Sequence, residues 1–526
     1  MTAPPDSSAG ARIPAAPRTT AKRARKRSRE RGVALVLVLG ALTILTVMLT
    51  DFQDNTSAEL GSALSARDSL KAEYAARSAI SLSRLLIASE PTIRKVMAPL
   101  FMMMGSAPPQ IPVWEFSDQV LGAFNDKAGA MKFSALASVS LDKGKNLGLE
   151  GAGFEIDIID EDSKINLNSP VRDPLTANRT AAQIMGLIKA PQFDPLFTAR
   201  DGDGQYSDRL AICSALVDWV DMDQIQTNCD FTNASPSTAT EDSFYQLLDP
   251  PYFRKNAPFD SLEEVRLVRG IGDDFWSTFV EPDPMNQRRR PVTVWGTGKV
   301  NVNTANAQTL LAVVCANTNP PAKMCLDPLE AAKFIGIVTL VRQFTAGAPL
   351  FGSPKGFIAA LKQTNPMIGP LLKMMGLEPV TFASESEATK SITTESKVFS
   401  IIATGYVRSG QRQTKVRIHS VVDFRSAPPP PNVLAALMSA GGGSTGAAGG
   451  LAAGGLAGGL AGGGLAAGGL AGASTPNLAS LQSSLSGMQS IPGVTPQNLP
   501  AGATSDAYSQ LLVPSPGGRI VYFHFD

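Results

Sequence analysis

One stretch of this 526-residue sequence gathers carboxylates at a spacing that suits a hard divalent cation. Asp218, Asp221 and Asp223 lie close together, and the loop that follows brings back Glu241 and Asp242. Calcium takes six to eight oxygen ligands, and carboxylates two residues apart beside such a loop can supply several of them. We therefore expect a calcium site at these five residues, with a solvated acidic face as the alternative.

Two further segments carry weaker signals for chemistry. Residues 201–205 read Asp-Gly-Asp-Gly-Gln, which matches only the first positions of an EF-hand loop and lacks its terminal glutamate. Residues 267–272 resemble a helix-hairpin-helix turn, whose backbone amides can hold a DNA phosphate. The alternative, which we favour, is a turn that only packs two helices, with Phe275 and Trp276 in the core.

The composition argues against catalysis and against nucleic-acid binding. His419 and His524 are the only histidines, so the chain has no two-histidine motif of a zinc hydrolase and no convincing Ser/His/Asp arrangement. Residues 1–32 hold nine basic and two acidic side chains, which leaves 38 basic and 44 acidic ones in the remainder. Because phosphate binding needs clustered Lys and Arg, we expect the acidic remainder to have no nucleic-acid partner. Because the chain lacks these catalytic arrangements, we also expect that it is not an enzyme.

A single segment has the length and apolarity of a transmembrane helix. Residues 33–50 contain no charge, which is about the minimum span for a helix across a bilayer. Basic residues precede it and Asp51, Asp54 and Glu59 follow it, which places the N-terminus in the cytoplasm and the large C-terminal part outside. The sequence thus predicts a single-pass inner-membrane protein with an exported, periplasmic body.

Three kinds of signal fit this segment: a cleaved secretory signal, an uncleaved signal anchor and a prepilin signal. No Ala-x-Ala-like site directly follows Thr50, which disfavours the first. The small residue Gly32 instead precedes the apolar run, an arrangement that resembles prepilin signals, in which a peptidase cuts on the cytoplasmic side and leaves Val33 first. Prepilins usually carry glutamate at the fifth mature position, but here that residue is Leu37. The absence of this glutamate suits a subunit with no neighbour above it, since in prepilins the carboxylate pairs with a neighbour's N-terminal amine.

The four cysteines fall into two local pairs, Cys213 with Cys229 and Cys315 with Cys325. In an oxidising periplasm we expect disulfides with this connectivity, although three pairings are formally possible. Metal binding by the cysteines lacks the required CxxC spacing.

Periodicity predicts a long helix, a helical insert and a few strands. Apolar residues continue at helical spacing to residue 89, with no proline between 51 and 89. Alternation predicts a strand around 154–160, a hairpin over 399–422 that turns at 408–410, and a final strand at 519–525.

An internal duplication is visible between these strands. Lys164-Ile165-Asn166-Leu167-Asn168-Ser169 recurs as Lys299-Val300-Asn301-Val302-Asn303-Thr304, and helical periodicity follows each copy. Ser169 and Thr304 stand where helix N-caps are expected. Residues 426–505 contain no charged side chain and include a Gly/Ala/Leu-rich stretch, so we expect a flexible insertion there.

These motifs together resemble one family, the minor pseudopilin K of the type II secretion system. The resemblance runs in the family's order from residue 31 to about 305, and it rests on these segments: Arg31-Gly32-Val33-Ala34-Leu35, Glu73-Tyr74-Ala75-Ala76-Arg77-Ser78, residues 160–168, residues 216–223, Pro250-Pro251-Tyr252-Phe253, residues 263–271, and Asn301-Val302-Asn303-Thr304-Ala305. The chain departs from the family in its long basic leader, its Gly/Ala/Leu-rich insertion and residues 201–204.

The resemblance implies an α+β fold, in which a pilin-like long N-terminal helix packs on a small antiparallel sheet and a large duplicated all-α domain is inserted between strands. The expected parts are as follows: leader 1–32; helix 33–89; first pilin-like part 90–165; helical insert 166–390, with subdomains of about 166–295 and 299–390; hairpin 391–425; flexible insertion 426–510; and last strand 511–526. Calcium in the insert is also implied.

The implied role is structural, at the tip of the periplasmic pseudopilus. Family members help to initiate this filament, which exports folded proteins across the outer membrane. The implied partners are the minor pseudopilins I and J, other pseudopilins, the inner-membrane secretion platform and prepilin peptidase, which would cut after Gly32 and methylate Val33. The alternatives are a minor pilin of a type IV pilus or DNA-uptake machine, and a signal-anchored periplasmic domain or enzyme.

Overall fold

The computed structural model describes residues 27–103, 107–125, 151–198, 200, 206–231, 244–248, 250–345, 347–428 and 515–525. The chain divides into two compact units, residues 1–70 and residues 71–526. The expected leader up to residue 26 and nearly all of the expected flexible insertion lie outside the described residues.

In the first unit, the described chain consists of the N-terminal part of helix α1 (Arg27–Met103). Large apolar side chains between Val33 and Leu49 are 51–68% exposed all around the helix. Among the described residues, α1 is the one helix long and apolar enough to cross a membrane. An apolar surface on every side of a helix needs lipid or other helices to cover it, which fits a single-pass anchor.

In the second unit, α1 packs through a face of small side chains. Ala72, Ala75, Ala76 and Ala79 are buried, and Ile80 continues the same face. The helix was expected to end at residue 89, but it continues through Pro91 and Pro99 to Met103. A proline inside a helix removes one backbone hydrogen bond.

Side-chain contacts hold this extension of α1 in place. Arg94 pairs with Glu90 and with Glu395, which lies just before strand β6 (Val398–Ser409). Glu90 in turn accepts a hydrogen bond from the backbone N–H of Ile111 at 3.0 Å. These contacts hold the helical turn around Pro91.

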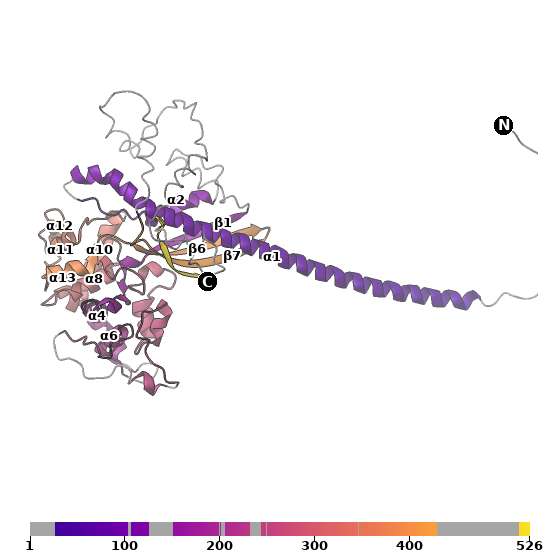
Figure 1. Cartoon of the computed structure of the whole chain (residues 1–526), viewed down its shortest axis with the longest axis horizontal. Coiled ribbons are helices and arrows are strands. Elements are labelled where there is room, and N and C mark those ends of the chain that lie inside the picture. Colours follow the sequence, from indigo (N-terminus) through magenta and orange to yellow (C-terminus); the bar gives the residue numbers. More distant parts are fainter. Residues whose placement is uncertain are drawn as a thin grey trace, which may run out of the picture. The chain divides into compact units, whose positions relative to one another are not determined.

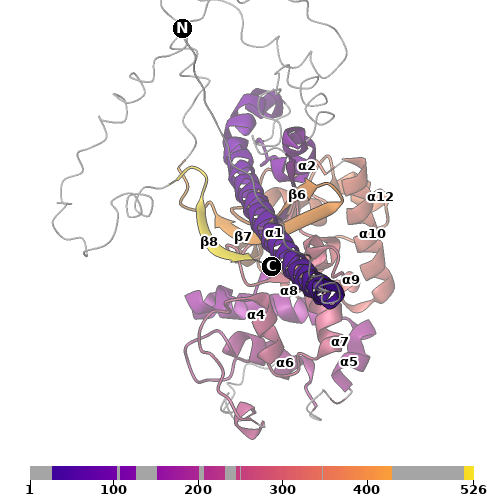
Figure 2. The ribbon, with the colours of Figure 1, turned by 90° about the vertical axis from the view of Figure 1, so that its right-hand side faces the viewer.

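A four-stranded antiparallel sheet lies against α1 (Figure 1). Its order is β1 (Ala152–Asp160), β6 (Val398–Ser409), β7 (Arg412–Asp423) and β8 (Arg519–Phe525). The alternation of the sequence predicts these strands and the hairpin of β6 and β7. One face of the sheet presents Phe154, Phe399 and Ile401 to α1, and the ring of Trp114 lies 4.6 Å from that of Phe399. Strand β8 forms one edge of the sheet (Figure 2).

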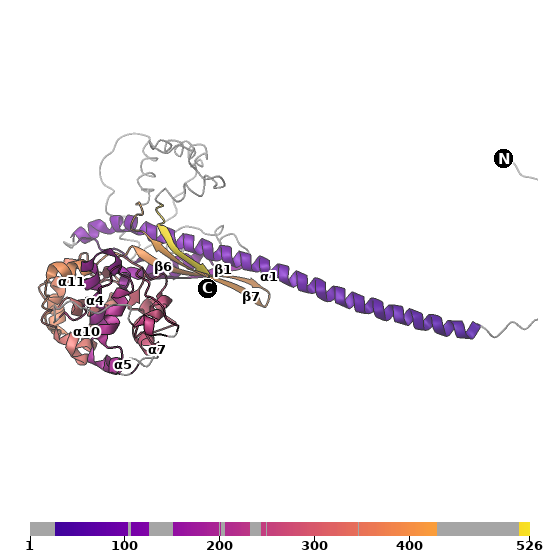
Figure 3. The ribbon, with the colours of Figure 1, turned by 60° about the horizontal axis from the view of Figure 1, so that its bottom comes forward.

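The insert leaves the sheet after β1 and returns at β6, and its helices gather together as one body (Figure 3). The helices that the structure describes after α1 are α2 (Ser117–Leu121), α4 (Pro174–Ile188), α5 (Asp194–Thr198), α6 (Arg209–Asp218), α7 (Asp273–Phe275), α8 (Ala307–Ala316), α9 (Lys323–Leu326), α10 (Pro328–Phe344), α11 (Pro354–Leu361), α12 (Gly369–Met374) and α13 (Glu385–Ser391). The long N-terminal helix, the small antiparallel sheet and the mostly helical insert are the fold class that the sequence predicts.

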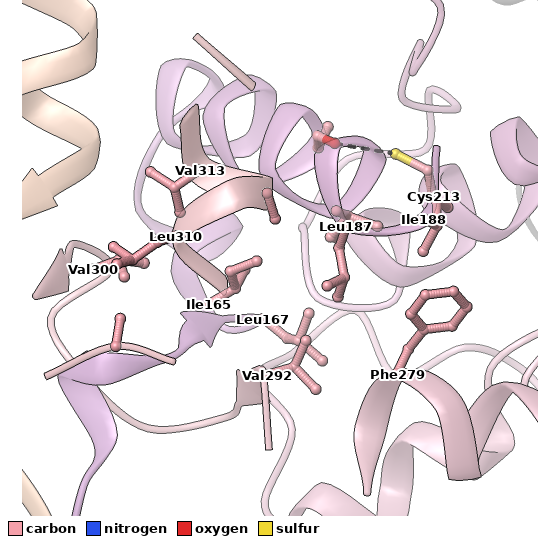
Figure 4. Close-up of a cluster of buried hydrophobic side chains, with 14 of the residues drawn as sticks. Ile165, Leu167, Leu187, Ile188, Cys213, Phe279, Val292, Val300, Leu310 and Val313 are labelled. Atoms are coloured by element: carbon pink, nitrogen blue, oxygen red, sulfur yellow. Dashed lines mark hydrogen bonds between the residues drawn. The ribbon is translucent and has the colours of Figure 1, made fainter. Parts of the chain in front are cut away.

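Each copy of the duplicated motif begins a short parallel strand pair. β2 (Ile165–Asn166) pairs with β3 (Val292–Thr293), and β4 (Val300–Asn301) pairs with β5 (Ile392–Thr393). The helices of each half therefore lie, in the sequence, between two strands that pair with each other. Apolar side chains of these strands meet α4 and α8 in one core (Figure 4).

The predicted N-caps are wrong. Asp173 caps α4 by accepting from the backbone N–H of Thr176 at 2.8 Å, and Asn306 caps α8 by accepting from that of Thr309 at 2.7 Å. Ser169 instead begins a 3₁₀ turn, and the hydroxyl of Thr304 donates to Asp160 at 2.5 Å. The asparagines of each motif hold the turns, as when Asn168 bonds the backbone of Phe259 in both directions.

A buried acidic turn joins the sheet to both halves of the insert. Asp160 ends β1 and accepts from the hydroxyls of Thr304 and Ser396, both at 2.5 Å. Asp162 accepts from the backbone N–H groups of Thr297 at 2.6 Å and Lys397 at 2.7 Å. Thr297 lies between the two halves of the insert, and Thr304 lies at the start of the second half. Ser396 and Lys397 lie directly before β6. The turn thus fixes three separate passes of the chain.

We predict that Gly405→Ala separates α1 from the sheet. A Cβ atom at Gly405 would lie 1.9 Å from the carbonyl oxygen of Ala72 and 2.8 Å from the backbone nitrogen of Ala76, and backbone cannot move aside locally. Such overpacking costs about 1–3 kcal/mol or more, so the thermal midpoint of the full chain should fall. The control is Gly336→Ala on the exposed side of α10, where a Cβ meets nothing within 4 Å and the midpoint should hold or rise. Equal midpoints for the two variants would contradict the close approach.

A second prediction concerns pH and Asp160. Burial and the charge of Asp162 raise the pKa of Asp160 to about 7. The folded state therefore holds a proton that the unfolded state releases near its ordinary pKa of 3.8, so this stabilisation is complete below that value and disappears as the pH rises through about 7. Asp160→Asn should make the thermal midpoint less dependent on pH between 5 and 8, whereas Asp274→Asn, at an exposed position, should keep the wild-type dependence. Parallel profiles for all three proteins would refute this role of Asp160.

Candidate functional site

The residues of the expected prepilin processing site lie in α1. Gly32 and Val33 are consecutive residues of this helix, and Val33 is 63% exposed. The basic side chains before residue 27 lie outside the described residues. Cleavage after Gly32 and methylation of Val33 stay predictions.

The first three carboxylates of the expected calcium site lie at the end of α6 and in the loop that follows it. Asp218 is the last residue of α6 and is buried, whereas Asp223 is exposed. The next residue, Trp219, fixes the start of the loop, because its ring stacks on Phe259 at 6.2 Å and its N–H donates to Glu264. Glu241 and Asp242 lie outside the described residues, so the structure describes only Asp218, Asp221 and Asp223 of the five expected ligands.

A disulfide closes this loop at its base. The structure links Cys213, in α6, to Cys229, and it links Cys315, at the end of α8, to Cys325 in α9. Asp218, Asp221 and Asp223 all lie between Cys213 and Cys229, so the first disulfide limits how far the acidic loop can open. Thr227 strengthens the closure, because its backbone N–H donates to Asp218 Oδ1 at 2.8 Å.

The electrostatics of the loop are those of crowded carboxylates. Burial raises the pKa of Asp218 to about 6, despite the hydrogen bonds from Thr227. Burial together with the charges of Asp218 and Asp223 raises the pKa of Asp221 to about 7. A cation in the loop would relieve this repulsion and hold the carboxylates ionised at neutral pH.

Arg254 partly compensates the negative charge of these carboxylates, and nothing in its sequence context indicated this role. Its guanidinium donates to the backbone carbonyls of Asp218 at 3.1 Å and of Asp223 at 2.6 Å. With three ionised carboxylates against one guanidinium, the loop would keep two negative charges. That remainder matches the charge of a divalent cation.

The described residues fit calcium in part. Asp221 Oδ1 is buried without a hydrogen-bond partner in the described structure, an orphaned acceptor that a cation could satisfy. In the same part of the chain, no three His, Cys, Asp or Glu side chains converge closely enough to form a metal site by themselves. Asp218, Asp221 and Asp223 would thus hold only part of a coordination shell, and the rest would have to come from oxygens outside the described residues or from water.

The two weaker motifs contribute no further described site. In the turn at residues 267–272, Gly270 has a φ of +79° and a Cβ there would lie 2.5 Å from the side chain of Ile212 in α6, so the turn packs closely against that helix. Phe275 and Trp276 are buried, which confirms their expected place in the core. Residues 201–205 lie outside the described residues.

Comparisons with known proteins bear on the family. Residues 163–278 match the family model described as type II secretion system, protein K. No curated protein matches the chain. Among solved structures, a chain of the crystal structure of the GspK-GspI-GspJ complex from the enterotoxigenic Escherichia coli type 2 secretion system is 16% identical, with a TM-score of 0.32 over 52% of this chain and 75% of that one.

The family model matches less than half of the chain. The matched range begins in the buried acidic turn and contains the duplicated motif's first copy, the acidic loop and its disulfide. It covers much of the ordered series of segments on which the resemblance rests. Over residues 163–278, the chain is similar to protein K of the type II secretion system.

Proposed function

We propose that the chain is a minor pseudopilin at the tip of the periplasmic pseudopilus, where it helps to initiate the filament and to export folded proteins across the outer membrane. The observation that carries the proposal is the protein K match in a chain that also has a long apolar N-terminal helix. The family match supports the minor pseudopilin role, and the tip position rests on the features below.

The N-terminal helix suits a subunit with neighbours on its sides and none above it. Its apolar side chains between Val33 and Leu49 are exposed all around, so they require lipid in the membrane and packed helices in a filament. At the fifth mature position, Leu37 offers no carboxylate to the N-terminal amine of a subunit above. A subunit with this residue can begin a filament but lacks the ion pair needed in its middle.

The partners follow from this position. We infer association with the minor pseudopilins I and J, the other pseudopilins and the inner-membrane secretion platform; the solved complex named above joins GspK to GspI and GspJ. Prepilin peptidase would cut after Gly32 and methylate Val33. The protein would then lie in the inner membrane with its C-terminal domain in the periplasm.

The decisive measurement is N-terminal mass spectrometry of the membrane-extracted protein from cells with and without active prepilin peptidase. We expect the mature chain to begin at N-methylated Val33 only when the peptidase is active, and to co-purify with pseudopilins I and J. An intact leader in peptidase-competent cells would leave a signal-anchored periplasmic domain. A processed chain that associates only with type IV pilins would favour a pilus or DNA-uptake machine.

We further propose that Asp218, Asp221 and Asp223 bind calcium, with Glu241 and Asp242 as additional ligands. The support is the orphaned Oδ1 of Asp221, the raised pKa values of Asp218 and Asp221, and the net negative charge that Arg254 leaves. When bound, calcium would supply the positive charge that lets these carboxylates ionise together. The disulfide at the base of the loop keeps them close before the ion arrives, which reduces the entropy lost on binding.

Asp221→Asn should weaken calcium binding by roughly tenfold or more, because it removes a charged oxygen ligand and keeps the shape of the side chain. The measurement is calorimetric titration of calcium into the EDTA-treated full chain in detergent. Asp274→Asn makes the same substitution at an exposed position outside the loop and should bind like the wild type. Unchanged affinity in Asp221→Asn would remove this loop from the calcium proposal.

A further inference from the structure

The second half of the insert contains a small apolar cavity with one charged side chain in its wall. The cavity has a volume of about 80 Å³. Its lining comes from α8, α10, α11, α12 and the segment after α10, and includes Leu310, Phe334, Ile337, Phe357, Leu361 and Leu372. An apolar cavity gives water few hydrogen-bond partners, so it suits an apolar group better than water.

The charged side chain is Arg342, in the last turn of α10. Its Nη2 donates to the backbone carbonyl of Val302 at 3.3 Å. Within the described parts of the chain, Arg342 makes no ion pair with a carboxylate. Glu115 is the one carboxylate that acts on its charge there, and Glu115 is 46% exposed and already lies 3.8 Å from Arg288. A guanidinium has five N–H donors, so Arg342 has donors to spare.

The charge on Arg342 persists although its surroundings are apolar. Burial lowers the pKa of Arg342 to about 10, so the side chain is still protonated at neutral pH. Its position at a helix C-terminus stabilises the positive charge. Arg342 is partly buried, and an incoming carboxylate would pair with it through charge-assisted hydrogen bonds.

The entrance to the cavity is held in a fixed shape. Asn303 Oδ1 accepts from the backbone N–H groups of Leu350 at 3.2 Å and Phe351 at 3.0 Å, and its Nδ2 donates to the carbonyl of Phe351 at 2.9 Å. Ala348 and Leu350 line the cavity and are also exposed, which places them where the cavity meets solvent. A wall held in this way needs little reordering when a ligand enters.

We propose that this cavity is a binding site for a branched aliphatic group joined to a carboxylate, with the aliphatic group in the cavity and the carboxylate on Arg342. The size sets the aliphatic part, since an engineered apolar cavity of about 150 Å³ accepts benzene and one of half that volume suits an isopropyl or isobutyl group. This chemistry occurs in free branched-chain acids and in the C-terminal leucine or valine of a polypeptide. The site is independent of the pseudopilin role proposed above.

The first test changes only the ligand. N-acetyl-L-leucine is titrated by calorimetry into the full chain in detergent, and N-acetyl-L-leucinamide replaces it in a parallel titration, with empty micelles as the blank for both. The amide keeps the isobutyl group and lacks the carboxylate, so it should bind at least about tenfold more weakly. Equal binding of the two compounds, or no binding of either, overturns the proposal.

The second test changes the protein. Arg342→Gln should weaken N-acetyl-L-leucine at least about tenfold, and Arg342→Lys should retain more of the affinity because it keeps the charge. Ala348→Phe should block the entrance and abolish binding without removing any core side chain. Arg289→Gln makes the same change at a 68% exposed arginine outside the cavity and should bind normally. Normal binding in both Arg342→Gln and Ala348→Phe refutes the assignment.

Comparing isovalerate with a tripeptide that ends in leucine distinguishes the two possible sources of the ligand. Tighter binding of the tripeptide points to a polypeptide C-terminus, and tighter binding of isovalerate points to a free acid; either result supports the shared chemistry. A negative result in every arm leaves N-terminal processing at Val33 unaffected, so it would remove this site alone.

Discussion

The structure of residues 71–526 depends on two buried carboxylates at the end of β1. A buried charge is tolerated only when its hydrogen bonds are satisfied, and Asp160 and Asp162 satisfy theirs from three separate passes of the chain. The groups that donate to them are thereby held at fixed positions around one turn. Glu161, between them, is buried and forms an ion pair with Lys164 at 3.1 Å, so the charge of Glu161 is compensated locally. The sheet and the helical insert therefore share one polar centre in addition to their separate apolar cores.

This centre explains how a large helical insert can interrupt a small sheet without disturbing its register. Asp160, where the chain leaves the sheet, is the pairing partner of Phe399, near the point where it returns. Each half of the insert also closes on itself through a two-residue parallel pair. The helices between those pairs can therefore be long or short without moving β1 relative to β6. Each disulfide also stays within one half of the insert, so neither disulfide links the two halves.

The sequence predicted those features that depend on local periodicity. Alternating residues predicted β1, β6, β7 and β8, and the repeated Asn-x-Asn motif predicted two related halves. The helix end at residue 89 was wrong because Pro91 is usually a helix breaker, and the contacts that retain it involve Glu395, some three hundred residues away. The caps at Ser169 and Thr304 were wrong for a similar reason, since the hydroxyl of Thr304 has a distant partner in Asp160. The spacing of Asp218, Asp221 and Asp223 indicated an acidic segment, whereas Arg254 and the Arg342 cavity depend on tertiary contacts that no local pattern records.

The adjacency of the exit and entry points of the insert also has a mechanical consequence. Neighbouring strands lie about 4.8 Å apart, so a force applied through the insert reaches the sheet at one end of the β1–β6 pair. Such a force would peel the backbone hydrogen bonds apart one after another, beginning at Asp160 and Phe399. A load carried along α1 would act on the whole alanine face and on the contact at Gly405 at the same time, in shear. The fold is thus stiff along its helix and comparatively weak where the insert is attached, and the acidic turn is placed where the peeling would start.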